Sequence, residues 1–273
     1  MNVLRFAFSN IAWTPHDDPE IFSLLRHHGI EGIEVAPTAV WGSWEAITVS
    51  KAKAYRQFLH GQGFEVPALQ AILYGKSEAR LFEEHGETVL LEHFARVAGI
   101  ASALEARVAV LGAPSQRDRA GRSWPRALEH AAGVLRKAAM VFHDQGCCLC
   151  IEPNPRRYGC NFVNTAQEGI DLVAAVGHPG LRLHLDAAGM YLENDDLASV
   201  LPTALPVLRH FHVSEPDLGD FRRSVVPHTA NLNRLRASGY GGWCSVEMRR
   251  PSAPLADAGP WAVIAIARSG ANG

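Results

Sequence analysis

The sequence predicts an α/β protein that folds as a single (β/α)8 TIM barrel over residues 1–273. The length of 273 residues is close to the roughly 250 residues that are typical of one such barrel. Eight short apolar runs alternate with longer segments of helical pattern. Nearly continuous apolar runs are typical of parallel strands that are buried on both faces. Together these observations favour a closed barrel with an outer ring of helices.

The eight predicted strands cover residues 4–9, 32–36, 66–73, 107–111, 148–152, 181–186, 208–213 and 243–248. Predicted helices between them run from Asp18 to Gly29, Ser123 to Gly146, Thr165 to Gly177 and Thr229 to Gly239. Thr165 and Glu168 form a capping-box pattern at the start of the third of these helices. An open, doubly wound sheet is the alternative fold. The absence of a glycine-rich dinucleotide fingerprint after the first strand weakens that alternative.

Composition and charge exclude several classes of protein. Apolar residues make up 47% of the chain, enough for a large core, and charged residues make up 20%, too few for a disordered chain. With 26 Lys and Arg against 28 Asp and Glu, the net charge of −2 argues against a nucleic-acid partner. No apolar run approaches the roughly 20 residues that span a bilayer. The start of the chain, residues 1–9, lacks the order of a secretory signal, so we expect a cytoplasmic protein.

Five cysteines, an odd number, do not suggest a disulfide framework in a chain of this length. Cys147, Cys148 and Cys150 fit the pattern of an apolar strand. A thiolate metal site at these residues is the less favoured alternative, because no second Cys/His pair has the spacing of a zinc site.

Four of the predicted strands end in residue types that bind metal ions, namely Glu152, Asp186, His212 and Glu247. The C-terminal ends of the strands meet at one rim of the barrel. Three carboxylates at one rim would repel one another unless a cation lay among them. Three oxygen ligands and one imidazole suit Mn²⁺, Mg²⁺ or Co²⁺, and Zn²⁺ is also accepted by such a set. The sequence therefore predicts one divalent metal ion.

Strand alternation places His184 and His210 one layer deeper in the barrel than Asp186 and His212. The favoured interpretation is that both histidines are hydrogen-bonded residues of the barrel interior. The alternative is that they support the metal ligands from behind.

Four segments of the chain resemble the xylose-isomerase-like barrels, and the resemblance extends over nearly the whole chain. The segments are Ile151–Asn154, His184–Asp186, His212–Glu215 and Gly239–Met248. The last segment, with its Gly-Tyr-x-Gly-Trp-x-Ser-x-Glu pattern, is the most specific. The start at Ser9–Trp13 is also typical of members described as sugar phosphate isomerases or epimerases. The superfamily includes sugar isomerases, ketose 3-epimerases, inosose dehydratases and a branch of apurinic endonucleases.

The resemblance implies a metal-dependent isomerase or epimerase of carbohydrate metabolism that acts on a sugar or sugar phosphate. Glu152, Asp186, His212 and Glu247 match the four metal ligands of the ketose epimerases, with manganese a typical metal. Glu152 and Glu247 would also act as acid and base around a metal-stabilised enediolate. A lyase or dehydratase of a keto-sugar or keto-inositol on the same site is the alternative, because loss of a β-hydroxyl needs only a suitably placed acid.

Two positions depart from the ketose epimerases: Gly189 replaces a histidine and Leu218 replaces an arginine, both of which contact substrate there. The endonuclease branch is less favoured, because it needs three zinc ions and further histidines, of which only His228 remains. The third interpretation is a sugar-binding protein without activity, against which the intact set of four ligands argues.

Six further residues are candidates for substrate contact: Trp13, Glu34, Gln70, Asn154, Arg117 and His228. Arg117, Arg119, Arg222 and Arg223 offer guanidinium groups that suit a phosphate or carboxylate. Ordinary loop packing is the alternative for each of them. A homo-oligomer is compatible with the sequence.

Overall fold

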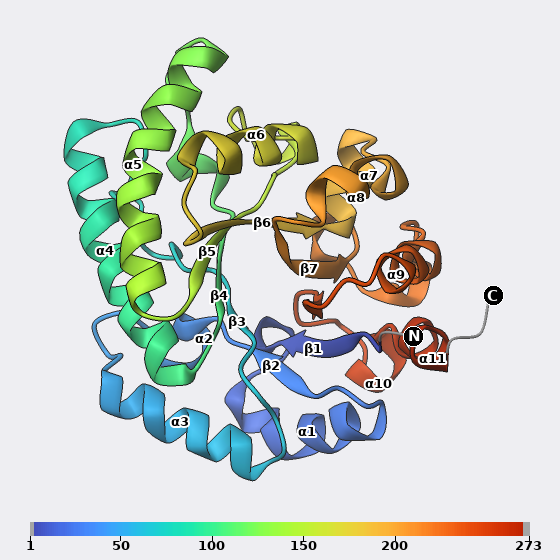
Figure 1. Ribbon diagram of the computed structural model, residues 1–273. Coiled ribbons are helices and arrows are strands. Elements are labelled where there is room, and N and C mark those ends of the chain that lie inside the picture. Colours follow the sequence, from blue (N-terminus) through green and yellow to red (C-terminus); the bar gives the residue numbers. More distant parts are fainter. Residues whose placement is uncertain (1–2, 270–273) are drawn as a thin grey trace.

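Eight parallel strands form the centre of the molecule (Figure 1) in the computed structural model, which describes residues 3–269. Residues 1, 2 and 270–273 of the predicted domain therefore lie outside the described part. The strands are β1 (Arg5–Ser9), β2 (Gly32–Glu34), β3 (Ala68–Leu69), β4 (Val108–Leu111), β5 (Cys148–Ile151), β6 (Leu181–Asp186), β7 (Leu208–Ser214) and β8 (Trp243–Glu247). Their order is β2-β1-β8-β7-β6-β5-β4-β3.

The barrel closes between β2 and β3 through two isolated bridges, Gly32 with Glu65 and Val35 with Leu69. The Val35 amide donates to the Ala68 carbonyl at 3.0 Å, and the Gln70 amide donates to the Val35 carbonyl at 3.0 Å. The predicted (β/α)8 barrel is thus confirmed, and the open sheet is excluded.

Strand β3 is much shorter than the predicted strand at residues 66–73. Pro67 has no amide hydrogen to give to a neighbouring strand. Ala71 has a positive φ of 52°, and the Tyr74 amide donates to the Ala71 carbonyl in a turn. The chain therefore leaves the sheet after Gln70 and continues as a loop over the C-terminal rim.

Helices surround the barrel (Figure 1). They are α1 (Asp18–His27), α2 (Pro37–Trp41), α3 (Val49–Gly61), α4 (Glu84–Leu104), α5 (Trp124–Asp144), α6 (Ala166–Val176), α7 (Ala187–Glu193), α8 (Leu197–Ala204), α9 (His228–Ala237), α10 (Leu255–Ala258) and α11 (Trp261–Ser269). The capping box at Thr165 and Glu168 is confirmed. The prediction that Thr229 caps a helix is wrong. Because the Asn231 amide bonds to the Pro227 carbonyl, the N-cap residue is Pro227, two residues earlier, and α9 begins at His228.

The barrel interior is apolar on one side and polar on the other. A small apolar cluster of Ala68, Val108, Val110 and Cys150 fills the side of β3, β4 and β5. The side of β6, β7 and β8 instead buries His184, His210, His212 and Ser245. This asymmetry sets the position of the polar site at the rim.

All five cysteines are free. Within residues 3–269, no group of three or more metal-binding side chains includes a cysteine.

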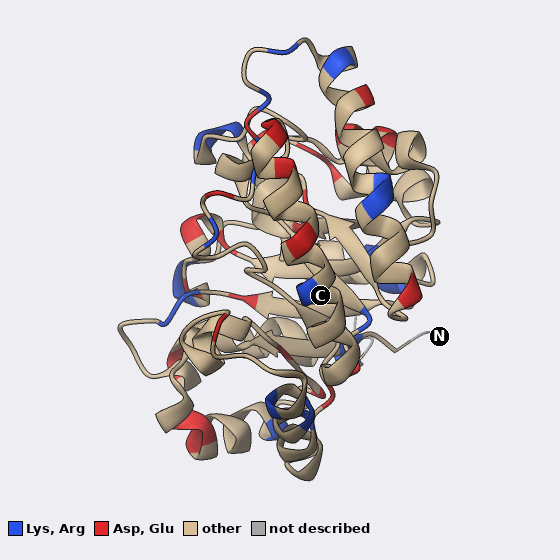
Figure 2. Cartoon of the chain, turned by 90° about the vertical axis from the view of Figure 1, so that its left-hand side faces the viewer, with Lys and Arg blue, Asp and Glu red and all other residues tan. Residues whose placement is uncertain are grey.

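No helix in this part of the chain has the length and apolar character needed to cross a membrane. Acidic and basic residues are interspersed over the outer helices and loops (Figure 2).

Candidate metal centre at the barrel rim

The four strand-end residues meet at the C-terminal rim: Glu152 directly follows β5, and Asp186, His212 and Glu247 lie on β6, β7 and β8. Ligand atoms of Glu152, Asp186 and His212 all lie within 4.8 Å of one another. Glu247 Oε2 lies 3.2 Å from His212 Nδ1, and Asp186 Oδ2 lies 4.0 Å from the same nitrogen. Two carboxylates and the imidazole of His212 thus form one compact group, and the Glu247 carboxylate joins it through its contact with His212 Nδ1.

The start of α7 fixes Asp186, which is the N-cap residue of that helix. Its Oδ1 accepts a hydrogen bond from the Gly189 amide at 2.6 Å, and its Oδ2 accepts one from the Ser214 hydroxyl. A Cβ at position 189 would lie 3.2 Å from Asp186 Oδ1. Gly189 thus holds this carboxylate through its backbone.

Glu152 follows β5 and packs against the loop after β4. A Cβ at Gly112 would clash with Glu152 Oε2, so a larger residue there would displace the carboxylate. Arg117 Nη2 donates to the Glu152 carbonyl at 3.0 Å. Burial raises the pKa of Glu152 to about 8, and the neighbouring Asp186 and Glu247 carboxylates contribute to that rise. Burial and Glu247 also raise the pKa of Asp186.

His212 is oriented by Glu34, which lies behind it in the barrel. Glu34 is fully buried, with one oxygen 3.0 Å from His212 Nε2 and the other 3.2 Å from His210 Nε2. Burial lowers the pKa of His212, but Glu34 and Glu247 outweigh that effect and hold it well above its usual value. Burial likewise raises the pKa of Glu34, but His212 and His210 hold it well below the usual value. The contact with Nε2 leaves Nδ1 directed at the carboxylates.

The residues at this point fit a divalent cation. His212 Nδ1 is buried and makes no hydrogen bond of ordinary geometry within residues 3–269, although Glu247 Oε2 lies 3.2 Å away. Asp186 and Glu247 contribute to the raised pKa of Glu152, and Glu247 contributes to the raised pKa of Asp186, as expected for a cluster whose counter-charge is a bound ion. Three oxygens with one imidazole nitrogen suit Mn²⁺, Mg²⁺ or Co²⁺, and Zn²⁺ is also accepted by such a set.

A cavity of about 470 Å³ lies over this cluster and is lined by Glu152, His212 and Glu247. Residues 70–74 after β3 and 112–116 after β4 form much of its wall, together with Ile11 and Leu218. No Lys or Arg of the described chain lines it. The wall is therefore largely apolar, and the ionisable groups lie on one side.

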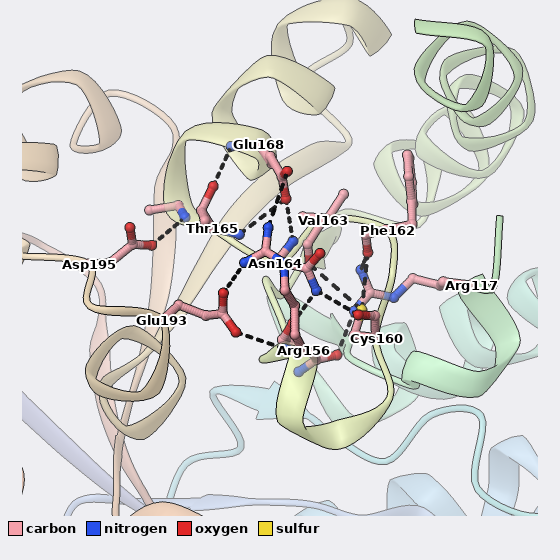
Figure 3. Close-up of polar contacts among 12 residues, drawn as sticks. Arg117, Arg156, Cys160, Phe162, Val163, Asn164, Thr165, Glu168, Glu193 and Asp195 are labelled. Carbon is pink, nitrogen blue, oxygen red and sulfur yellow. Dashed lines mark hydrogen bonds and ion pairs between the residues drawn. The ribbon is translucent and has the colours of Figure 1, made fainter. Parts of the chain in front are cut away.

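Of the residues predicted to contact substrate, only Gln70 lines this cavity; its amide donates to the Ser9 hydroxyl. Asn154 and Arg117 instead hold the loop after β5. Arg117 is 1% exposed and donates to the Phe162 carbonyl at 3.1 Å and to Asn154 Oδ1. Figure 3 shows this arginine directed at Phe162, and it also shows the contacts of Arg156 with Glu193 and Glu168.

Trp13, His228 and Glu34 make other contacts. Trp13 lines a different cavity and donates from Nε1 to Asp18 Oδ1 at 2.7 Å. His228 Nε2 lies 2.7 Å from Glu215 Oε1. Glu34, expected at the substrate, is buried behind His212.

Ser214 and Gly112 were not singled out from the sequence. Ser214 stands two residues after His212, so strand alternation places both on one face and could have indicated it. Gly112 carries no comparable signal, because its role depends on how closely Glu152 approaches it.

The fold and the rim residues define a class: (β/α)8 barrels with a carboxylate-rich candidate metal centre at the C-terminal ends of the strands. Residues 22–266 match the model of the family described as xylose isomerase-like TIM barrel. The chain belongs to this family.

Several curated relatives and solved structures are similar to the chain. It is 31% identical over 119 residues to D-psicose 3-epimerase of Ruminiclostridium cellulolyticum, covering 44% of the chain and 39% of that relative. It is 30% identical over 152 residues to L-ribulose 3-epimerase of Mesorhizobium japonicum, covering 56% of the chain and 47% of that relative. The chain thus aligns with less than half the length of either relative. The solved 3-keto-D-glucoside 4-epimerase from E. coli superposes with a TM-score of 0.75 at 18% identity, over 97% of this chain and 99% of the other, and shows the shared fold.

Proposed function

We propose that the protein is a divalent-metal-dependent epimerase or isomerase of a neutral sugar. The convergence of Glu152, Asp186, His212 and Glu247 at one side of a 470 Å³ cavity is the observation that carries this proposal. The names of the similar proteins, which act on psicose and ribulose, support sugar epimerisation.

Glu152, Asp186, Glu247 and His212 Nδ1 would hold the metal ion. When bound, the ion supplies a Lewis acid for the carbonyl and the neighbouring hydroxyl of the sugar. Glu34 acts as a positioning residue, because it holds the His212 ring from the side opposite Nδ1.

Glu152 and Glu247 move the proton. One carboxylate removes the carbon-bound proton next to the carbonyl, and the electron pair of that bond enters the enediolate. Return of a proton to the same carbon on the opposite face gives the epimer, and return to the neighbouring carbon gives the isomer. The largely apolar cavity wall limits the access of water to the enediolate.

The cavity favours a neutral sugar over a sugar phosphate. No Lys or Arg of the described residues lines it, and the nearby carboxylates would repel a phosphate. Arg117 is engaged by backbone carbonyls, and Arg222 pairs with Asp220 at 2.6 Å. Gln70, Ser115 and Gln116 offer uncharged polar groups for sugar hydroxyls.

The test uses purified protein with Mn²⁺ and a panel of free ketoses and ketose phosphates in heavy water. We expect deuterium at carbon in the recovered sugar and its epimer or isomer, with the free sugar turned over faster than its phosphate. Glu152→Gln and Glu247→Gln should each lower turnover by about 100-fold or more. Glu20→Gln, at an exposed position on α1, is the matched control and should not change turnover.

Other outcomes contradict the proposal in identifiable ways. Loss of water with deuterium in the product would indicate the dehydratase alternative. Near wild-type turnover in either glutamine variant would overturn the assignment of acid and base. Elemental analysis of three zinc ions per chain would favour the endonuclease branch, and failure to bind any divalent ion would favour a sugar-binding protein.

A further inference from the structure

Three imidazoles are packed together inside the barrel, below the rim. His184 on β6 and His210 and His212 on β7 are each at most 1% exposed. One ring nitrogen from each lies within 4.8 Å of the others. The ring centroids of His184 and His212 are 4.1 Å apart, and those of His184 and His210 are 5.4 Å apart.

The nitrogens of this cluster are incompletely satisfied. Within residues 3–269, His210 Nδ1 and both nitrogens of His184 have no hydrogen bond of ordinary geometry, although the backbone of His210 approaches the His184 ring. His210 Nε2 contacts the Glu34 carboxylate at 3.2 Å, and His212 Nδ1 contacts Glu247 Oε2 at 3.2 Å. Buried polar atoms in folded proteins almost always have a partner. The nitrogens that lack one indicate that a ligand of the cluster belongs there.

We propose that His184, His210 and His212 form a second metal site, which binds a borderline transition metal ion such as Zn²⁺. Imidazole is a preferred ligand of Zn²⁺, and three histidines are a known protein ligand set for it. Glu34 contacts both His210 and His212, so its carboxylate offsets part of the charge of the ion. Mg²⁺ and Mn²⁺ prefer oxygen ligands and belong at the rim instead.

The two sites share His212, which belongs to both groups of potential ligands. The rim ion would use His212 Nδ1, which faces Glu247, whereas His212 Nε2 faces Glu34, which also contacts His210. The cavity reaches His212 from the rim side. This inference concerns metal binding and does not depend on the sugar chemistry.

The experiment is a Zn²⁺ titration of the metal-free protein against a chromophoric chelator, with elemental analysis after desalting. The rim variant Glu152→Gln/Glu247→Gln keeps all three histidines and should still bind one Zn²⁺ per chain. Adding His184→Gln to that variant should weaken Zn²⁺ binding by at least about 100-fold, because loss of an outer partner alone costs 10–100-fold. His85→Gln, at an exposed position on α4, is the matched control and should leave the affinity unchanged.

Each remaining outcome decides the question. A rim variant that binds no Zn²⁺ would overturn the proposal and would mean that the nitrogens are hydrogen-bonded to water. Equal losses from His184→Gln and His85→Gln would overturn it as well. Should circular dichroism show that His184→Gln is unfolded, Co²⁺ added to the rim variant gives an independent answer. Strong visible bands of a nitrogen-rich, four-coordinate ion support the site, and weak bands of octahedral Co²⁺ contradict it.

Discussion

The side chain of Glu34 faces His212 from inside the barrel, and the proposed metal ion lies on the opposite side of the ring. A carboxylate in this place fixes the ring orientation and makes the imidazole a stronger ligand. We therefore expect Glu34→Gln to lower the affinity for Mn²⁺ by about 10–100-fold. A calorimetric titration with Mn²⁺ measures this change, with Glu20→Gln as the control. An unchanged affinity would show that His212 needs no support from Glu34.

The raised pKa of Glu152 predicts that metal binding depends on pH. Burial and the neighbouring carboxylates hold this pKa at about 8 in the metal-free site, so the group carries a proton below that pH. A bound ion needs the carboxylate, and binding therefore releases the proton. Affinity for Mn²⁺ should therefore rise between pH 6 and 8 by about tenfold per pH unit for each proton released. His212, whose pKa is also raised, contributes a second proton. Titrations across this range measure the slope, and a flat profile would contradict the assignment.

The same shift acts on the stability of the metal-free protein in the opposite direction. The folded state binds the Glu152 proton more tightly than the unfolded chain, whose pKa is the ordinary value of 4.5. The free energy of unfolding should therefore fall as pH rises from that value toward 8. Added Mn²⁺ should remove this loss, because it replaces the proton as counter-charge. Thermal melts at pH 6 and 8, with and without Mn²⁺, check both statements.

At the level of single residues, the sequence predicted which four residues meet at the rim. It could do so because Glu152, Asp186, His212 and Glu247 stand at the ends of recognisable strands. It did not place Glu34 behind His212, because these residues belong to β2 and β7 and meet only through the closed barrel. Trp13 was expected at the cavity from its position after β1, but its indole bonds to Asp18 instead.

The Glu152 carboxylate lies so close to Gly112, in the loop after β4, that a Cβ at this position would meet it. Gly112→Ala should displace the Glu152 carboxylate, weaken Mn²⁺ binding by about tenfold or more, and lower the free energy of unfolding by about 1–3 kcal/mol. Calorimetric titration and denaturant unfolding measure the two effects.

Gly133→Ala is the matched control for this loop variant. Gly133 lies in α5, and a Cβ added there would meet nothing within 4 Å, so alanine should raise the free energy of unfolding by about 0.4–1 kcal/mol. Equal effects of the two substitutions on Mn²⁺ affinity would contradict the role of Gly112.

Element boundaries were predictable where the chain carries clear signals. The predicted strand at residues 181–186 has the bounds of β6, and the helix from Thr165 has the predicted capping box. Of the strand predicted at residues 66–73, only two residues are in β3, because the chain turns at Ala71, which has a positive φ. An apolar run in the sequence does not reveal such a local backbone conformation.

The barrel closes between β2 and β3 through two isolated bridges and a few backbone hydrogen bonds, and its stability depends on them. Val35→Pro would remove the amide that donates to the Ala68 carbonyl and leave that buried carbonyl unpaired. We expect the free energy of unfolding to fall by about 1–3 kcal/mol. Val49→Pro should change it by less than about 0.5 kcal/mol, because Val49 is the first residue of α3, where proline is accepted. Denaturant unfolding compares the two, and equal values would show that the closure contributes little.

The fold class was predictable from the sequence because apolar strands and helical segments alternate along the whole chain. The polar side of the barrel interior was not, because the layer of His184, His210 and Ser245 forms only when β6, β7 and β8 lie side by side. Alternation indicated which residues point inward. It did not show that their nitrogens remain without partners.

The candidate metal ligands and much of the cavity wall come from different halves of the chain. Strands β5 to β8 provide every candidate rim ligand, whereas the loops after β3 and β4, residues 70–74 and 112–116, provide much of the cavity wall. Under the proposed function, variation confined to residues 71–74 and 113–116 can thus alter which sugar fits without disturbing the ion. Such a protein is a favourable starting point for directed evolution: libraries confined to residues 71–74 and 113–116 should yield new sugar preferences in catalysts that keep the parental metal affinity.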